Sequence, residues 1–368
     1  MNFDFSEDQK LLQQTARDYL EANAPLSVCR RVLEGGEPYA KELWNGAAEL
    51  GWLGTAIPEE YGGAGFGPLE LALIAEELGR ALAPIPFGPT VYVAAEAIRL
   101  AGSEAQKAKY LTRIAAGDAI GTYAFTEDAG QNDVESVAAT LEGGAVRGVK
   151  QPVPDGAAAD FAIVAARSGK GLSLAIVDLA GPGVAREPLA SIDPARPLAK
   201  LVLDGAPAEL LGAEGEGEAL AARVLDRAAA LMAFEQLGAA SAAFENTRAF
   251  TLGRYAFGRP IASFQAIKHR LADLWCELEL ARSNCYWAAW ALANDDAELA
   301  LAACSARIQA TRALDLATVE QIQMHGGVGY TWEYDCHLFY RRARWLAAAL
   351  GGTHAWSDRL VGRLDSAA

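Results

Sequence analysis

The sequence predicts an α+β protein with a helical domain, a small antiparallel β domain and a C-terminal four-helix bundle. The spacing of the apolar residues indicates this order. They recur every three or four positions in residues 1–118, every second position in residues 119–212, and every three or four positions again in residues 213–368. A chain of 368 residues is also too long for one ordinary core, so we expect two or three packed units.

The N-terminal domain begins with a helix start signal. Ser6 precedes Glu-Asp-Gln, which is typical of a helix cap, and Gly51 and Gly117 are typical of helix ends. A Gly- and Pro-rich stretch, I-P-E-E-Y-G-G-A-G-F-G, starts at Ile57. It is either a connector between helices or a loop that approaches a ligand.

Short runs with period two follow, separated by Gly, Asp and Pro. They lie at residues 121–125, 138–141, 161–165, 173–177 and 200–203. From residue 216 onward the pattern is helical, with long Ala- and Leu-rich segments at 218–252, 263–294, 296–324 and 335–350. Four such helices predict a bundle, and their alanine-rich faces would let a second bundle pack closely, unless the alanine only reflects a GC-rich genome.

The stretch from Thr247 to Asp273 predicts a corner between two of these helices. Helical spacing continues to Phe257, Gly258-Arg259-Pro260 breaks it, and Ser263 is expected to cap a helix that starts at Phe264. Arg254 and Phe257 would then lie one turn apart, close to Gln265. A guanidinium for a phosphate, an aromatic stacking face and an amide suit a dinucleotide, although an ordinary hairpin with an exposed arginine fits the spacing too.

Composition excludes several other classes of protein. A net charge of −15 and a pI of about 4.8, without any basic run, argue against a nucleic-acid partner. The five cysteines are scattered and the four histidines have no ligand spacing, so we expect neither disulfides nor a metal. Neither a secretion signal nor an apolar run of roughly 20 residues is present, so a cytoplasmic protein without a membrane span is expected.

Five motifs carry a family resemblance across essentially the whole chain. They are R-x-x-F-G-x-x-I-x-x-F-Q from Arg254, P-E-E-Y-G-G from Pro58, F-T-E from Phe125, Q-M-H-G-G-V-G-Y from Gln323, and R-R-A-R from Arg341. Together they resemble the acyl-CoA dehydrogenase family. The resemblance implies the helix–strand–helix fold, FAD, α,β-dehydrogenation of a CoA thioester, electron-transfer flavoprotein as acceptor, and dimers or tetramers. The thioesters of the family are short, branched, aromatic or steroid side-chain compounds.

The resemblance also implies roles for single residues. Arg254, Phe257 and Gln265 match residues at the diphosphate and adenosine half of FAD. Gln323, Gly326 and Gly327 match the loop that closes over the dinucleotide of a neighbouring subunit. Phe125 and Thr126 match the residues that line the pyrimidine edge of the flavin ring.

The sequence departs from the family pattern at the flavin ring and at the base. Pro152-Val153-Pro154 replaces the W-I-T or W-I-S run, and Pro154 has neither a hydroxyl nor an N–H for flavin N5. Asn132 stands where many relatives have a serine near the CoA phosphate.

The two positions of the family's catalytic glutamate are here Leu350 and Ala228. Glu235 lies seven residues beyond Ala228, on nearly the same helix face but about 10 Å along the axis. Asp226 points to the opposite side. Either acid could serve as the base only if the register slips or the helix bulges.

Three interpretations follow. The chain is a self-sufficient flavin dehydrogenase with a displaced base such as Glu235. Alternatively, it is a subunit of a heteromeric acyl-CoA dehydrogenase that lends its Arg254 and Gly326 segments in trans, which the pattern of losses favours. The third interpretation is a fold relative that performs other flavin chemistry on a non-CoA substrate.

Overall fold

The computed structural model describes residues 5–128, 130 and 136–367, with only the backbone at 366 and 367. The chain splits into two compact units. The first, called the helical unit here, comprises Met1–Arg30, Pro68–Ala83 and Ala229–Ala368; the second, the mixed unit, comprises Arg31–Gly67 and Pro84–Ala228. The domain boundaries near residues 118 and 212 stay a prediction.

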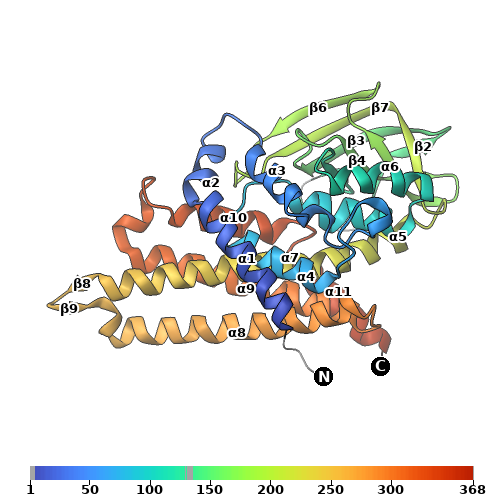
Figure 1. The fold of residues 1–368 in the computed structure, drawn as a ribbon. Helices are drawn as coiled ribbons and strands as arrows, with labels where there is room; N and C mark the ends of the chain where they lie inside the picture. The colour runs from blue at the N-terminus through green and yellow to red at the C-terminus, as the bar shows by residue number, and fades with distance from the viewer. Residues whose placement is uncertain (1–4, 129, 131–135, 368) are drawn as a thin grey trace. The chain divides into compact units, whose positions relative to one another are not determined.

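The helical unit is built from long helices, which Figure 1 shows running alongside one another. In chain order they are α1 (Glu7–Asn23), α4 (Pro68–Arg80), most of α7 (Gly217–Gly253), α8 (Gln265–Ala293), α9 (Leu299–His325), α10 (Cys336–Ala348) and α11 (Thr353–Ala367). Helix α2 (Leu26–Leu33) crosses the boundary between the units. The four predicted C-terminal helices are confirmed as α7 to α10.

The start of α1 agrees with the sequence-based prediction, whereas the C-terminal end of the helical region does not. Ser6 accepts a hydrogen bond from the Gln9 amide at 3.2 Å while the Gln9 side chain accepts from the Ser6 amide at 2.9 Å, so the predicted cap is a complete capping box. Helix α11 was not predicted, because the last helical segment expected from the sequence ends at residue 350. Arg363 binds it to α9 by donating to the Ala300 carbonyl at 2.6 Å.

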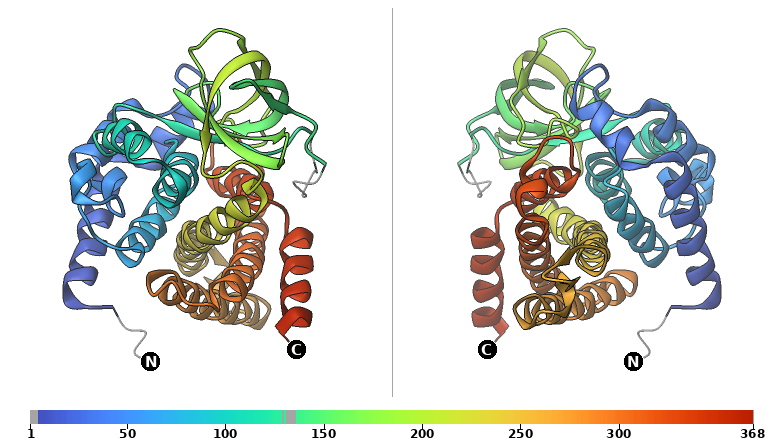
Figure 2. Two further views of the ribbon diagram at one scale, coloured as in Figure 1. Left: turned by 90° about the vertical axis from the view of Figure 1, so that its right-hand side faces the viewer. Right: turned by 90° about the vertical axis from the view of Figure 1, so that its left-hand side faces the viewer.

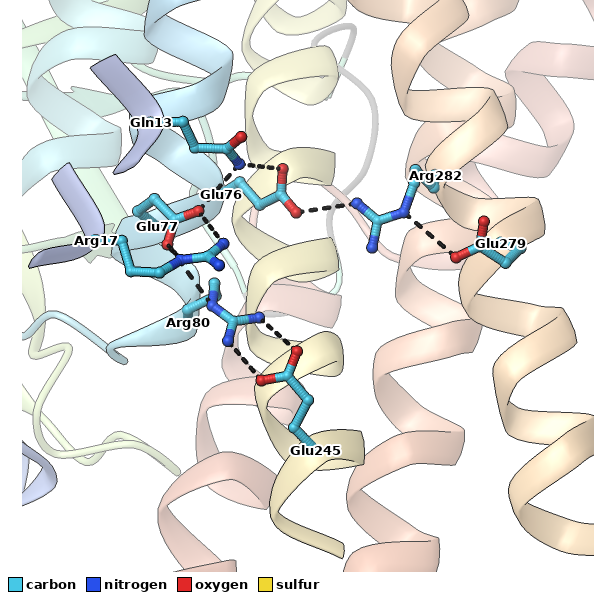
Figure 3. Close-up of polar contacts among 8 residues, drawn as sticks. All are labelled: Gln13, Arg17, Glu76, Glu77, Arg80, Glu245, Glu279 and Arg282. Atoms are coloured by element: carbon cyan, nitrogen blue, oxygen red, sulfur yellow. Dashed lines mark hydrogen bonds and ion pairs between the residues drawn. The ribbon is translucent and has the colours of Figure 1, made fainter. Parts of the chain in front are cut away.

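Acidic side chains of α4 hold the helical unit together through a buried polar network (Figure 3). Glu77 accepts two hydrogen bonds from Arg17 of α1, at 2.8 and 2.9 Å. Glu76 accepts from Arg282 of α8 at 3.2 Å and from Gln13 of α1 at 3.1 Å. Buried carboxylates are tolerated when charged donors satisfy them, so the network specifies which helices meet α4.

The mixed unit combines short helices with a curved sheet (Figure 2). Its helices are α3 (Lys41–Glu49), η1 (Trp52–Gly54), η2 (Glu59–Tyr61), the π-helix η3 (Gly88–Ala95), α5 (Glu96–Ala101) and α6 (Glu104–Ala115). Its strands are β1 (Gly121–Ala124), β2 (Thr140–Glu142), β3 (Ala145–Pro154), β4 (Phe161–Ser168), β5 (Gly171–Asp178), β6 (Val184–Leu189) and β7 (Leu198–Leu211).

The pairing order β4-β2-β3-β7-β5 returns to β4, so these strands close into a ring; β1 is added beside β4, and β6 beside β7. Most strand pairs are antiparallel, as predicted, but β1 and β2 run parallel to β4. The alternation of apolar and polar residues in a sequence does not indicate the direction of a strand. Strands β3 and β6 were not predicted because prolines interrupt both. In β6, Pro188 is tolerated because the strand lies at an edge.

The loop that starts at Ile57 is tightly folded. A β-carbon on Gly63 would lie 2.0 Å from the Ile57 carbonyl oxygen, so only glycine fits there. The Tyr61 hydroxyl donates to Glu104 at the start of α6, at 2.6 Å. These contacts explain the motif as a connector, and an influence on a ligand stays a prediction.

Candidate functional site

The corner between α7 and α8 differs from the predicted one. Helix α7 ends at Gly253, and a two-stranded hairpin follows, with β8 (Tyr255–Ala256) paired to β9 (Arg259–Pro260). Phe257 and Gly258 form its turn with φ values of 53° and 78°. Two successive positive φ angles are typical of the tight turns that close hairpins. The prediction that Arg254 and Phe257 share a helix face was therefore wrong.

The hairpin presents the predicted side chains to solvent. Figure 1 shows β8 and β9 projecting beyond the adjoining ends of α7 and α8. The Phe257 ring is 95% exposed, and Arg254 and Gln265 are exposed as well. Gln265 is the first residue of α8, as predicted. The hairpin and the start of α8 thus expose a guanidinium, an aromatic ring and an amide.

Packing within the corner fixes its shape. The Ile261 amide donates to the Arg254 carbonyl at 2.8 Å, and the Phe264 ring lies 6.2 Å from that of Phe257. The predicted cap at Ser263 was wrong, since Ser263 belongs to the short helix η4 (Ile261–Ser263) and Phe264 takes the cap position without a side-chain hydrogen bond. Phe264 instead stacks under the Arg259 guanidinium, whose central carbon is 4.1 Å from the ring centre.

The second predicted segment lies where α9 passes into η5 (Gly326–Tyr330). Gln323 is exposed in the last turn of α9. Gly326 has φ 62° and ψ −140°, a conformation reserved for glycine. A β-carbon on Gly326 or Gly327 would meet no atom within 4 Å, so this backbone is open to an approaching ligand.

His325 brings the two segments together. Its ring stacks on Phe250 in the last turns of α7, with ring centres 4.0 Å apart, and its Nδ1 lies 2.6 Å from the Gln321 carbonyl oxygen. Burial lowers the pKa of His325, partly offset by that backbone hydrogen bond, which favours a neutral ring donating from Nδ1. The Arg254 end of α7 and the Gly326 turn are thereby held side by side within the helical unit.

The predicted flavin-edge residues belong to the mixed unit. Phe125 is buried and Thr126 half-buried, directly after β1. The Thr126 carbonyl accepts from the Gln151 amide at 3.0 Å. Pro154 is buried at the end of β3, and its carbonyl accepts from the Thr122 hydroxyl at 2.5 Å. Pro154 therefore offers no donor, and its one acceptor is engaged.

The two positions of the family base carry no titratable group. Leu350 is buried with φ 60°, and Ala228 is fully buried on α7. Glu235, the candidate substitute, is 5% exposed on the same helix.

A buried arginine, Arg307, fixes the turn at Leu350. Arg307 donates to the carbonyls of Leu346 and Ala349, the latter at 2.7 Å, and also binds Gln236 and Thr311.

Sequence reasoning missed two buried cations that organise these segments, Arg307 and Lys150. Lys150 pairs with Glu127 at 2.7 Å in the mixed unit. Lys150 follows Val146 and Val149 and precedes Val153 in the sequence, and this was the available signal, because a charge that a strand buries must find a buried partner. Asn132 lies outside the described residues.

These residues fit one half of FAD better than the other. Arg254 and the open glycine backbone suit a diphosphate, and the exposed Phe257 ring suits an adenine. At the flavin ring, Thr126 retains a hydroxyl, but the prolines of β3 give no N–H. Across the described residues, no helix has the length and apolarity needed to cross a membrane.

The order of helices, strands and helices along the chain agrees with the family that the sequence motifs resemble. Residues 6–118 match the family model of the acyl-CoA dehydrogenase N-terminal domain, and residues 215–363 that of the C-terminal domain. The chain belongs to the acyl-CoA dehydrogenase family.

Relatives and solved structures agree along the full length. The chain is 32% identical over 345 residues to acyl-CoA dehydrogenase IpdE2 of Mycobacterium tuberculosis, covering 94% of this chain and 93% of the relative. It is similar to a structure of the ChsE4-ChsE5 complex from the same organism, with a TM-score of 0.91, 28% identity and full coverage of both chains. Butyryl-CoA dehydrogenase from Megasphaera elsdenii gives a TM-score of 0.91 at 28% identity, covering 99% of this chain and 100% of that one.

Proposed function

We propose that this chain is the FAD-half-site subunit of a heteromeric acyl-CoA dehydrogenase. One observation carries the proposal. The exposed residues matched to the adenosine diphosphate half of FAD are all retained, whereas the family's base position is Leu350 and its ring-facing run ends in Pro154. A subunit that completes a partner's site needs the first group and not the second.

Each retained residue has a defined task in this proposal. Arg254 binds the diphosphate, the Phe257 ring stacks on the adenosine half, and Gln265 hydrogen-bonds at the start of α8. Gln323, Gly326 and Gly327 close over the dinucleotide of the adjoining subunit, where a missing β-carbon allows close backbone approach. Phe125 and Thr126 line the pyrimidine edge of any ring bound in this chain.

The chemistry divides between subunits. Bound FAD would accept the hydride from the β-carbon of a CoA thioester and pass electrons on, with electron-transfer flavoprotein as the acceptor. The α-proton requires a carboxylate base, which the partner chain supplies in this proposal. The similarity to the ChsE4-ChsE5 complex, a structure of two named chains, supports a heteromer.

The test is flavin stoichiometry. The chain purified alone should carry far less than one FAD, and mixing it with a base-containing homologue encoded nearby should yield a stable complex with flavin that an acyl-CoA bleaches. Arg254→Ala should weaken FAD binding in that complex by about tenfold or more, as expected for a lost charged hydrogen bond. Arg248→Ala, which removes another exposed arginine, on α7, is the matched control.

A different result would favour the self-sufficient interpretation. Nearly one FAD per chain, bleached by an acyl-CoA without any partner, would contradict the proposal. Glu235→Gln should then abolish bleaching, because Glu235 is the acid on nearly the same helix face as the alternative base position, Ala228. Bleaching only by a non-CoA substrate would favour the third interpretation.

A further inference from the structure

The stretch of chain around the β8–β9 hairpin carries only positive charge. The chain has 47 acidic residues and a net charge of −15, yet none of its acidic residues lies between residues 246 and 272. This stretch contains five exposed cations, which are Arg248, Arg254, Arg259, Lys268 and Arg270. A local excess of cations on an acidic protein favours an anion as the bound group.

The two arginines of the hairpin have no carboxylate partner. Arg270, in the same stretch, pairs with Glu320 of α9 at 3.2 Å. Across the residues that the structure describes, Arg254 and Arg259 form no ion pair of this kind. Both guanidiniums are therefore available to an anion from outside the chain.

The register of the hairpin puts these two arginines on one face. Ala256 lies opposite Arg259. The Ile261 amide donates to the Arg254 carbonyl at 2.8 Å, which extends the pairing by one residue. Side chains alternate between faces along a strand, so Arg254, Ala256 and Arg259 share a face. Arg254 and Arg259 are then diagonal neighbours, with Cα atoms roughly 7–8 Å apart, and two long side chains at this spacing can reach the two phosphates of one diphosphate.

Stacking on an aromatic ring fixes the position of Arg259. Its guanidinium carbon lies 4.1 Å from the centre of the Phe264 ring, and that ring lies 6.2 Å from the ring of Phe257 in an edge-on arrangement. A guanidinium held on a ring face keeps its planar fork of N–H donors, and less side-chain entropy is lost when that fork binds. Arg259 is thus held beside the aromatic group to which the proposed function assigns the adenosine half of FAD.

We propose that Arg259 is a second diphosphate-binding residue, which together with Arg254 holds the diphosphate of the FAD bound in the adjoining subunit. This inference rests on the proposed function for the identity of the ligand, whose chemical class is a nucleoside diphosphate. Guanidiniums bind phosphate oxygens through paired, charge-assisted hydrogen bonds. The anion also relieves the repulsion between two like charges on neighbouring strands. The flavin ring and the base stay in the partner chain.

The test compares ADP with adenosine as probes, because the two differ only in the diphosphate. Both are titrated by calorimetry into the flavin-free complex of this chain with its partner. Wild type should bind ADP about 100-fold more tightly than adenosine, and Arg259→Met should reduce this preference about tenfold without changing the affinity for adenosine. The affinity for FAD should fall by the same factor. Arg248→Met, which removes another exposed arginine of the same acid-free stretch, should leave the preference unchanged.

Three results would overturn the inference. The first is an unchanged preference for ADP in Arg259→Met. The second is an equal loss in Arg259→Met and Arg248→Met, which would show a general effect of charge. The third is weaker assembly with the partner at an unchanged preference for ADP, because Arg259 would then bind the partner protein itself.

The proposed function fails by a different result. A chain that carries one FAD by itself and assembles with no partner would contradict that function. The preference for ADP over adenosine, measured on this self-assembled chain and on its Arg259→Met variant, would still decide whether Arg259 binds the diphosphate.

Discussion

Gly79 lies directly against the main-chain carbonyl of Glu235. A β-carbon on Gly79 would lie 1.9 Å from that oxygen, and a β-carbon on Gly238 would lie 1.8 Å from the carbonyl oxygen of Glu76. Helices α4 and α7 therefore pack backbone to backbone inside the helical unit. The close approach places α4 beside α7, while the arginine partners of Glu77 and Glu76 reach α4 from α1 and α8.

Replacing either glycine should destabilise the helical unit strongly. Gly238→Ala forces the two helices apart, and we expect a loss of about 3 kcal/mol or more in the free energy of unfolding. Urea denaturation measures this change in the free energy of unfolding. Gly362→Ala, on exposed α11 with no atom within 4 Å of the added carbon, should instead stabilise by about 0.5 to 1 kcal/mol. Equal effects of the two substitutions would contradict the close packing.

Arg307 should be essential to the turn that carries Leu350. Arg307→Met leaves the carbonyls of Leu346 and Ala349 and the side chain of Gln236 without their buried donor. We expect a loss of about 2 to 4 kcal/mol by urea denaturation, since unsatisfied buried acceptors carry their desolvation cost. The control is Arg312→Met, which removes an exposed ion pair with Glu277 and should cost less than about 1 kcal/mol.

Position 350 should accept a catalytic base if the family register holds. In the chain reconstituted with FAD without its partner, whose base would hide the effect, Leu350→Glu should raise the rate of flavin bleaching by an acyl-CoA. Leu350→Gln should not, because the amide has the same size without basicity. The difference should be about 100-fold, typical of a general base. Stopped-flow absorbance measures it. Equal rates for the two variants would show that residue 350 does not face the substrate.

The stability of the mixed unit should depend on Glu96 at acid pH. Burial would raise the pKa of Glu96, but hydrogen bonds from Arg99 at 2.7 and 2.8 Å and the charge of Arg227 outweigh burial and lower the pKa. A carboxyl with a lowered pKa in the fold stabilises it above about pH 4.5, its ordinary value, and loses this contribution as pH falls through the folded pKa.

The comparison of wild type with Glu96→Gln tests this. Their difference in unfolding free energy should be constant from neutral pH down to the ordinary carboxyl range and should shrink below it. Glu214→Gln, in an exposed ion pair with Lys170, should change the free energy of unfolding by less than about 1 kcal/mol throughout. A difference that grows on acidification would contradict the assignment.

Local sequence signals predicted the helices well and the irregular segments poorly. The capping box at Ser6 and the four long C-terminal helices follow from patterns within a few residues, and the structure confirms them. The turn at Phe257 was read as helix because its apolar spacing continues past Gly253. Strand β3 was missed because Pro152 and Pro154 oppose a strand locally, whereas pairing with β7 stabilises it.

The sequence by itself determined the family and the residue types at Arg254, Phe257 and Leu350, because these are properties of short motifs. Only the tertiary structure decided how those residues are held. Glu127 and Lys150 are 23 positions apart, Gln236 and Arg307 are 71 apart, and neither spacing predicts a contact. Burial makes each of these charges depend on a partner that the fold supplies, and a partner distant in sequence cannot be read from the residues around either one.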